Sequence, residues 1–205
     1  MTRTLLSAVY VAGLAVAEGL CLPRRLHRAR CGERWRQPGG RKSRAERLVM
    51  AAVVAGIWLL PAVHILTGWL RPVDYSLPSW VAFPAIGVFA LSLLLRWHGQ
   101  TKLGLAWSPT VELADQHGLV TDGIYARIRH PIYASLILWA VAQPVLIQNL
   151  LAGWGGPIAV AMVWLIRVPA EERMMLERFG EEYEAYVRRT GRALPRIWRR
   201  RDYRP

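Results

Sequence analysis

Residues Val120 to Tyr133 read V-T-D-G-I-Y-A-R-I-R-H-P-I-Y. Their charged and aromatic side chains are predicted to form a binding site at the start of a helix. Pro131 suits the first position of a helix, where its missing N–H costs nothing, and His130 before it is pushed toward extended geometry. A helix end of this kind presents unpaired N–H groups and a positive dipole, which favour an anionic ligand group. With Arg127 and Arg129 beside it, this stretch is expected to bring a soluble, charged cofactor to a membrane edge.

A second polar stretch begins where the last apolar run ends, and it reads I-R-V-P-A-E-E-R-M-M-L-E-R-F-G-E-E-Y-E-A-Y from residue 166 to 186. Arg167 is expected to end a membrane span. Pro169 is expected to break it and start a helix with Glu171 and Glu172 in the first turn, where carboxylates are favoured. Arg167 and Glu171 share a face if helical geometry survives the proline. The alternative is a snorkelling arginine followed by two glutamates that only cap a helix.

The composition joins two properties that soluble proteins rarely combine. Of the 205 residues, 53% are hydrophobic, yet the formal net charge is +13. Long apolar runs alternate with strongly basic loops, which is typical of a polytopic membrane protein. The basic charge is not matched by any nucleic-acid-binding signature, so nucleic acid is excluded as a partner and the Arg-rich segments are expected to bind anionic lipid headgroups.

Five apolar runs are predicted to cross the membrane, at residues 4–22, 48–70, 80–95, 133–148 and 151–168. The segment 23–47 carries nine Arg and one Lys against two Glu, and residues 188–205 carry eight Arg against one Asp. Basic segments stay on the cytoplasmic side, so the N-terminus is expected outside and the C-terminus in the cytoplasm. The fold class is therefore an all-α polytopic membrane protein.

The terminal hairpin is inferred from length. Residues 133–168 are apolar throughout, and one helix of that length would extend about 54 Å at ~1.5 Å per residue, nearly twice the hydrocarbon thickness. Gln148-Asn149 and the glycines at 153, 155 and 156 with Pro157 are expected to form its outer turn. Pro61 is expected to kink the second span. Residues 169–190 look like an amphipathic cytoplasmic helix, with a break expected at Gly180.

This topology predicts a single pocket. The two polar stretches flank the hairpin at its cytoplasmic ends, so residues 129–133 and 167–172 are expected to lie near each other. We divide the chain into residues 1–96, with three spans and a basic loop, and residues 97–205. The second part holds the polar segment 97–132, the hairpin and the basic tail.

Several other chemistries lack support in the sequence. No G-x-G-x-x-G follows a strand, no Walker loop is present, and G-W-G-G at 153–156 falls in the expected outer turn. Cys21 and Cys31 are too few for a zinc site or a disulfide framework, and no Cys/His cluster has metal-ligand spacing, so no metal is expected. No Ser or Cys has an evident paired base.

Four motifs together resemble the isoprenylcysteine carboxyl methyltransferase family. They are L-G-L-A-W-S at 103–108, H-G-L-V-T-D-G-I-Y at 117–125, R-H-P-I-Y at 129–133 and E-E-R-M-M-L-E-R-F-G-E-E-Y-E-A-Y at 171–186. The resemblance covers about residues 98–197, half of the chain, and leaves the first two spans outside it. It implies an integral membrane enzyme that uses S-adenosylmethionine.

The resemblance also implies residue roles. Arg167 would bind the carboxylate of the substrate, and Arg129 and Glu172 belong to the same motifs and are counted with it as candidate catalytic residues. The residues implied to line the cofactor are His117, Gly118, Leu119, Val120, Tyr125, His130, Pro131, Ile132, Tyr133 and Glu171.

The chemistry of the cofactor agrees with these residue types. Glu171 can accept hydrogen bonds from its ammonium or ribose hydroxyls, and the helix end at Pro131 can hold its carboxylate. Tyr125 and Tyr133 offer ring faces to the sulfonium. A bidentate Arg167 would orient an acceptor carboxylate that is already ionised at pH 7, so that no general base is required.

Alternatives remain open at this stage. The acceptor is expected to be lipophilic and to enter from the bilayer, and the family resemblance implies a prenylated cysteine that becomes a methyl ester. The same scaffold would suit an amine acceptor, as in phospholipid N-methyltransferases, or an NADPH-dependent membrane reductase. A membrane scaffold without catalysis is the non-enzyme alternative. The sequence does not indicate the oligomeric state.

Overall fold

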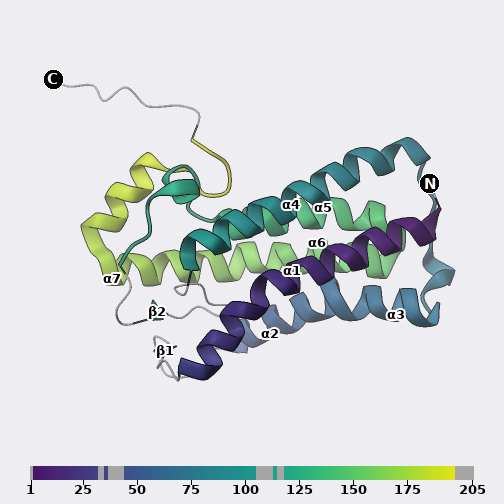
Figure 1. The fold of residues 1–205 in the computed structure, drawn as a ribbon, viewed down its shortest axis with the longest axis horizontal. Helices are drawn as coiled ribbons and strands as arrows, with labels where there is room; N and C mark the ends of the chain where they lie inside the picture. Colours follow the sequence, from purple (N-terminus) through teal and green to yellow (C-terminus); the bar gives the residue numbers. More distant parts are fainter. Residues whose placement is uncertain (1, 32–34, 37–43, 105–112, 115–117, 197–205) are drawn as a thin grey trace.

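The computed structural model is a bundle of helical passes that ends in a bent arm, and it describes residues 2–31, 35–36, 44–104, 113–114 and 118–196 (Figure 1). The passes are α1 (Arg3–Cys31), the continuous helix α2–η1–α3 (Arg44–Val53, Val54–Leu59, Leu60–Thr67), α4 (Ala82–Leu103), α5 (Pro131–Ile147) and the continuous helix α6–η6–α7 (Leu150–Met162, Val163–Arg167, Val168–Arg189). Short 3-10 turns lie between them at η2 (Arg71–Val73), η3 (Ser79–Val81) and η5 (Gly123–Ala126), and the two-residue strands β1 (Trp35–Arg36) and β2 (Leu113–Ala114) pair antiparallel. The all-α class is confirmed.

The predicted membrane spans are all helical. Four stretches are long and apolar enough to cross a membrane, at 3–23, 44–67, 79–103 and 150–189. The fifth, α5, has 17 residues, or roughly 26 Å, slightly less than the hydrocarbon core of about 30 Å. Two helices continue past their predicted ends, α1 through the basic residues to Cys31 and α4 to Leu103. Arg, Lys and Gln are good helix formers, so the end of an apolar run need not end its helix.

The terminal hairpin is confirmed, and its turn is tighter than predicted. Gln148 ends α5 in the left-handed conformation with φ 49°. Asn149 then caps α6, because its side-chain oxygen accepts from the backbone N–H groups of Leu151 and Ala152 at 3.0 and 2.8 Å. The turn therefore consists of residues 148 and 149 alone.

The glycines expected in that turn lie inside α6 instead, which corrects the prediction. A Cβ atom at Gly155 would lie 3.0 Å from the Cα atom of Gly56, and one at Gly156 would lie 2.0 Å from Oε1 of Gln143. The glycines thus let α6 approach both η1 and α5 closely. They serve packing, and G-W-G-G is a helical segment.

A polar cluster ties the helices together at the hairpin end of the bundle. Asp74 accepts from Arg3 Nη1 at 3.0 Å and from Asn149 Nδ2 at 2.7 Å, and His64 Nε2 lies 3.7 Å from its Oδ1 atom. These residues come from α1, the connection after η2, the hairpin turn and α3. The cluster therefore fixes three helix ends to the same carboxylate.

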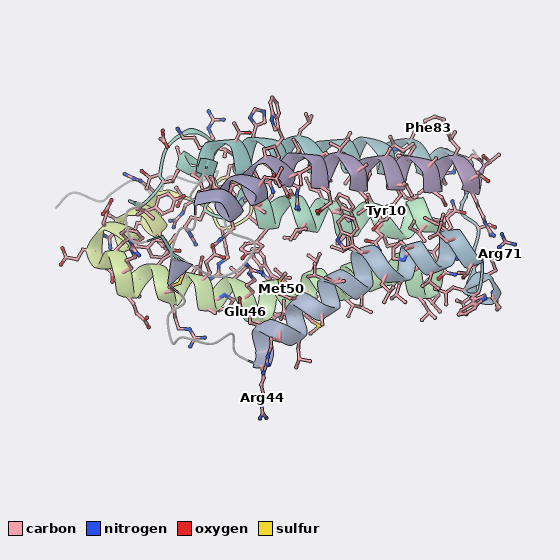
Figure 2. The ribbon with its side chains drawn as sticks, turned by 60° about the horizontal axis from the view of Figure 1, so that its bottom comes forward. Tyr10, Arg44, Glu46, Met50, Arg71 and Phe83 are labelled. Atoms are coloured by element: carbon pink, nitrogen blue, oxygen red, sulfur yellow. The ribbon has the colours of Figure 1, made fainter. Side chains whose placement is uncertain are left out.

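The middle of the bundle is filled by an aromatic cluster from α1, α4 and α5. Phe89 lies edge-on to Trp139 with ring centroids 4.6 Å apart, and Tyr10 stacks on Phe89 at 5.8 Å. Figure 2 shows Tyr10 reaching from α1 into the interior of the bundle. Offset and edge-on contacts of this kind favour one packing of the three helices.

The effect of Pro61 is a π-helical segment. Because proline has no N–H, the carbonyl of Ile57 loses its helical partner. The hydroxyl of Tyr10 donates to that carbonyl at 2.8 Å, and Gln143 Nε2 donates to the carbonyl of Gly56 at 2.8 Å. The disturbance expected at Pro61 thus takes the form of η1, whose buried carbonyls at Gly56 and Ile57 receive side-chain donors from α5 and α1.

We expect Tyr10→Phe to lower the free energy of unfolding by about 1–3 kcal/mol, because it leaves the buried Ile57 carbonyl without its donor. Tyr75→Phe is the matched control. The Tyr75 hydroxyl donates to the Pro144 carbonyl at 2.7 Å, but that carbonyl also accepts from the backbone N–H of Gln148. Thermal unfolding in detergent should rank Tyr10→Phe below Tyr75→Phe, and equal midpoints would contradict this account.

Candidate active site

The two polar stretches meet at the open end of the α5–α6 hairpin, opposite its turn, as the topology predicts (Figure 1). Glu172 Oε1 lies 3.3 Å from Arg129 Nη2 and 3.1 Å from His130 Nε2. One residue earlier, Glu171 Oε2 accepts a hydrogen bond from the hydroxyl of Tyr133. The start of α5 and the start of α7 are thus joined by two neighbouring carboxylates.

The start of α5 is placed by local sequence and by contact with α4. The helix begins at Pro131, and His130 before it has φ −122° and ψ 62°, outside helical geometry as predicted. A Cβ atom on Gly99 of α4 would lie 3.1 Å from Cγ1 of Ile132 and 3.4 Å from Cγ of Pro131. Glycine at 99 therefore allows α4 to press against the first turn of α5, so Pro131 and Ile132 also have a packing role.

The start of α7 is reached without the predicted break. The helix continues from α6 through η6 into α7, so the expectation that Pro169 separates two helices is wrong. Residues 163–167 widen into a π turn, which accommodates the missing N–H of the proline. Arg167 and Glu171 consequently remain one turn apart on continuous helix.

Arg167, Tyr133 and Glu171 form one group of side chains. Besides the hydrogen bond from Tyr133 to Glu171, Arg167 interacts with the Tyr133 hydroxyl. Nη1 of Arg167 also lies 3.1 Å from the sulfur of Met50 on α2. Figure 2 labels Met50 on α2, near the region where α6 passes into α7. A cation, an anion and an aromatic hydroxyl therefore converge at the end of the last apolar run.

Glu172 is the anion of a second group, with Arg129, His130 and Arg192. Arg192 Nε donates to Oε1 at 3.0 Å, and Arg192 Nη2 pairs with Oε2. Partial burial of Glu172 opposes its ionisation, but hydrogen bonds from His130 and Arg192 and their positive charge outweigh that effect and lower its pKa from 4.5 to about 2. The carboxylate stays ionised at physiological pH and counters the cations around it.

The second half of α7 folds back toward this group at a glycine. Gly180 has φ 49° and ψ −124°, a conformation that side-chain-bearing residues rarely adopt, so the break expected there is confirmed. Beyond the bend, Arg129 Nη1 donates to the carbonyls of Val187 and Thr190 at 3.2 and 2.7 Å. Arg129 thus caps the C-terminus of α7 while it pairs with Glu172.

The bend also leaves a hollow of about 460 Å³ between the two arms of α7. Its walls include Pro169 and Leu176 from the first arm and Tyr183 and Val187 from the second. Glu172 lies at its lining as well, so the ionic group is next to a mainly apolar space. We assign this hollow no ligand.

The remaining predicted residues are placed as follows. Tyr125 is buried in η5, and its hydroxyl lies 3.4 Å from the carbonyl of Gly99. Gly118 is exposed, and Leu119 and Val120 are half-buried, in the irregular chain before η5. His117 lies outside the described residues. Among the residues that the structure does describe, no group of three His, Cys, Asp or Glu is suited to hold a metal ion.

Sequence reasoning missed Arg192, which it assigned with the rest of the basic tail to lipid headgroups. It also missed the carbonyls of Val187 and Thr190 as partners of Arg129. One signal was available: a bend at Gly180 returns the chain toward Glu172, and Arg192 is the first arginine after the end of α7.

Comparison with known proteins finds similarity to one family. Residues 85–177 match the model of the isoprenylcysteine carboxyl methyltransferase (ICMT) family. The human protein-S-isoprenylcysteine O-methyltransferase is 36% identical over 121 residues, which is 58% of this chain and 43% of the human protein. The Schizosaccharomyces pombe protein-S-isoprenylcysteine O-methyltransferase is 30% identical over 115 residues, 55% of this chain and 49% of the yeast protein.

A solved structure is similar as well. The eukaryotic intramembrane Ras methyltransferase ICMT superposes with a TM-score of 0.52 at 25% sequence identity, over 76% of this chain and 55% of that one. The chain spans about half the length of the curated relatives it matches.

Proposed function

We propose, from the match of residues 85–177 to the isoprenylcysteine carboxyl methyltransferase family, that this chain is an integral membrane methyltransferase of that family. The proposed reaction moves a methyl group from S-adenosylmethionine to the carboxylate of a lipophilic acceptor, as in a protein bearing a prenylated cysteine. The observation that carries the proposal is the convergence of Arg167, Tyr133 and Glu171 at the end of the last apolar run.

The residues of this group fit the proposed methyl donor. Glu171 is half-buried and supplies carboxylate oxygens to an ammonium group or to ribose hydroxyls. Tyr133 supplies a ring face to a sulfonium, a contact of about 0.5–2 kcal/mol. The first turn of α5 supplies backbone N–H groups and a positive dipole to a carboxylate. S-adenosylmethionine would provide a methyl carbon whose bond to sulfur breaks, with the electron pair left on sulfur, as its bond to the acceptor oxygen forms.

Arg167 is the proposed partner of the acceptor carboxylate. A carboxylate offers a guanidinium two strong, charge-assisted hydrogen bonds. A carboxylate needs no proton removed at pH 7, so the chain's task is to orient it and to exclude water. We therefore assign no general base. His130 and Tyr125 are proposed to line the donor site with Tyr133.

The other candidates keep the same scaffold. A phospholipid or amine N-methyltransferase would need a group that accepts a proton from the amine, whereas Arg167 beside the apolar run favours an anionic acceptor. A reductase would bind NADPH in place of the methyl donor.

In the proposed orientation the N-terminus lies outside and both polar stretches face the cytoplasm, since the segments 23–47 and 188–205 are strongly basic.

The proposal is tested with membranes that contain the full chain and methyl-labelled S-adenosylmethionine. We expect label in the lipid-soluble fraction, and mild alkali should release it as methanol, because esters hydrolyse and N-methyl amines do not. Purified protein should bind S-adenosylhomocysteine and ignore NADPH. Glu171→Ala should weaken that binding and Arg167→Ala should abolish transfer. Arg173→Gln, an exposed change on the same helix, should do neither.

Alkali-stable label would replace the ester with an amine product. NADPH binding without S-adenosylhomocysteine binding would replace the methyltransferase with a reductase. If Glu171→Ala and Arg167→Ala both leave the activity of the protein in cells unchanged, a membrane scaffold without catalysis would be favoured.

A further inference from the structure

The chain beyond α7 lies directly against the candidate site. Residues Thr190–Arg192, which we call the C-terminal strap, run parallel to residues 127–130. The backbone N–H of Arg129 donates to the carbonyl of Gly191 at 2.8 Å, that of His130 donates to the carbonyl of Arg192 at 2.9 Å, and that of Gly191 donates to the carbonyl of Arg127 at 3.1 Å. Three main-chain hydrogen bonds therefore fix the strap beside the residue that precedes α5.

The strap brings one side chain into the ionic group. The guanidinium of Arg192 contacts both carboxylate oxygens of Glu172 and lies 5.9 Å from the ring centre of Trp164 in η6. A two-pronged contact with a carboxylate fixes its rotation as well as its distance. Arg192 thus connects α7, η6 and the start of α5.

Glu172 in turn fixes His130. Its Oε1 atom lies 3.1 Å from His130 Nε2, and the imidazole is 6% exposed and 5.5 Å from the ring of Tyr133, measured between centroids. An ionised carboxylate only accepts hydrogen bonds, so Nε2 must carry the proton. In the neutral form of the imidazole, Nδ1 is then the acceptor, and in either form the ring orientation is set from its Nε2 side.

We propose that Arg192 is a positioning residue of the methyl-donor site, which acts through Glu172 to fix the orientation and tautomer of His130. This inference rests on the proposed function, since it assigns His130 to the donor pocket. It differs from that function in the residue and in the mechanism, because Arg192 touches neither donor nor acceptor. Without Arg192, Glu172 keeps Arg129 and His130 at Oε1 but loses its contact at Oε2. Its rotation is then less restrained, and so is the orientation of His130.

Arg192→Gln tests the inference in the full-length protein. We expect its KM for S-adenosylmethionine and its Kd for S-adenosylhomocysteine to rise at least tenfold, with kcat within about twofold of the parent. Arg192→Lys should recover part of the loss, because it restores the charge without the two-pronged contact. Arg188→Gln is the control, since Arg188 pairs with exposed Glu184 at 3.6 Å and both side chains are more than half exposed.

A double-mutant cycle separates positioning from general stabilisation. In a Glu172→Gln background, Arg192→Gln should change the Kd less than twofold, because the path through Glu172 is already gone. Additive losses, or a lower unfolding midpoint with an unchanged Kd for the folded protein, would overturn the inference. A parent protein that binds no S-adenosylhomocysteine would instead refute the proposed function, which keeps the two failures distinct.

Discussion

Glu172→Gln is expected to lower kcat/KM for methyl transfer by about 100-fold and to destabilise the protein. The change keeps the shape of the side chain and removes its charge. Arg129 and His130, whose side chains are 10% and 6% exposed, would then lose their negatively charged partner at residue 172. Small displacements of groups that position reactants cost factors of this size.

The loss of stability follows from the same contacts. Removing one partner of a buried ion pair costs about 3–5 kcal/mol, because the other charge is left desolvated. Arg192 is 43% exposed and remains hydrated, which reduces the expected loss to the lower part of that range or below it. Glu184→Gln, in an exposed pair on the same arm of α7, should change neither activity nor the unfolding midpoint measurably.

The pH dependence provides a second readout. The pKa of Glu172 is lowered from 4.5 to about 2 in the folded protein. A lowered pKa contributes stability that is complete above 4.5 and is lost as pH falls from there toward 2. Unfolding midpoints measured between pH 7 and 3 should therefore fall more steeply with acid in the parent than in Glu172→Gln. Parallel curves would show that the folded protein does not hold this carboxylate in its charged form.

The elements that sequence predicted well depend on local pattern. Apolar length predicted where the long helices lie, and Gln148-Asn149 marked the hairpin turn because an amide side chain caps the next helix. The meeting of Arg129 with Glu172 followed from the hairpin alone, since its two ends must be adjacent. Gly180 was identified as a break because glycine tolerates the conformation that bends α7.

The parts that were missed depend on partners distant in sequence. Pro169 was expected to end a helix, and only the π turn before it allows the helix to continue. The glycines of α6 were assigned to a turn because their real partners, Gly56 and Gln143, lie far away along the chain. Arg192 reaches Glu172 only because α7 bends and the strap pairs with residues 127–130.

Gly56→Ala is expected to cost about 3 kcal/mol of unfolding free energy, which is large for one added methyl group. The new Cβ atom would lie 2.2 Å from the carbonyl oxygen and 2.6 Å from the carbonyl carbon of Gly155. These are backbone atoms of α6, so no side chain can rotate away and the helices must separate. The same separation would disturb the Gln143 hydrogen bond to the Gly56 carbonyl.

The distance from the site makes this variant informative about how the bundle positions Arg167. The continuous helix that packs on η1 also carries η6, and α2 supplies Met50 to the guanidinium. Moving α6 away from η1 should therefore weaken S-adenosylhomocysteine binding as well as lower the unfolding midpoint. Gly87→Ala in α4 is the matched control, because nothing lies within 4 Å of its Cβ position and alanine is favoured over glycine in a helix by roughly 1 kcal/mol. If Gly56→Ala proved as stable as Gly87→Ala, the close contact of α6 with η1 would not exist in the membrane-embedded protein, and the placement of Arg167 would need another explanation.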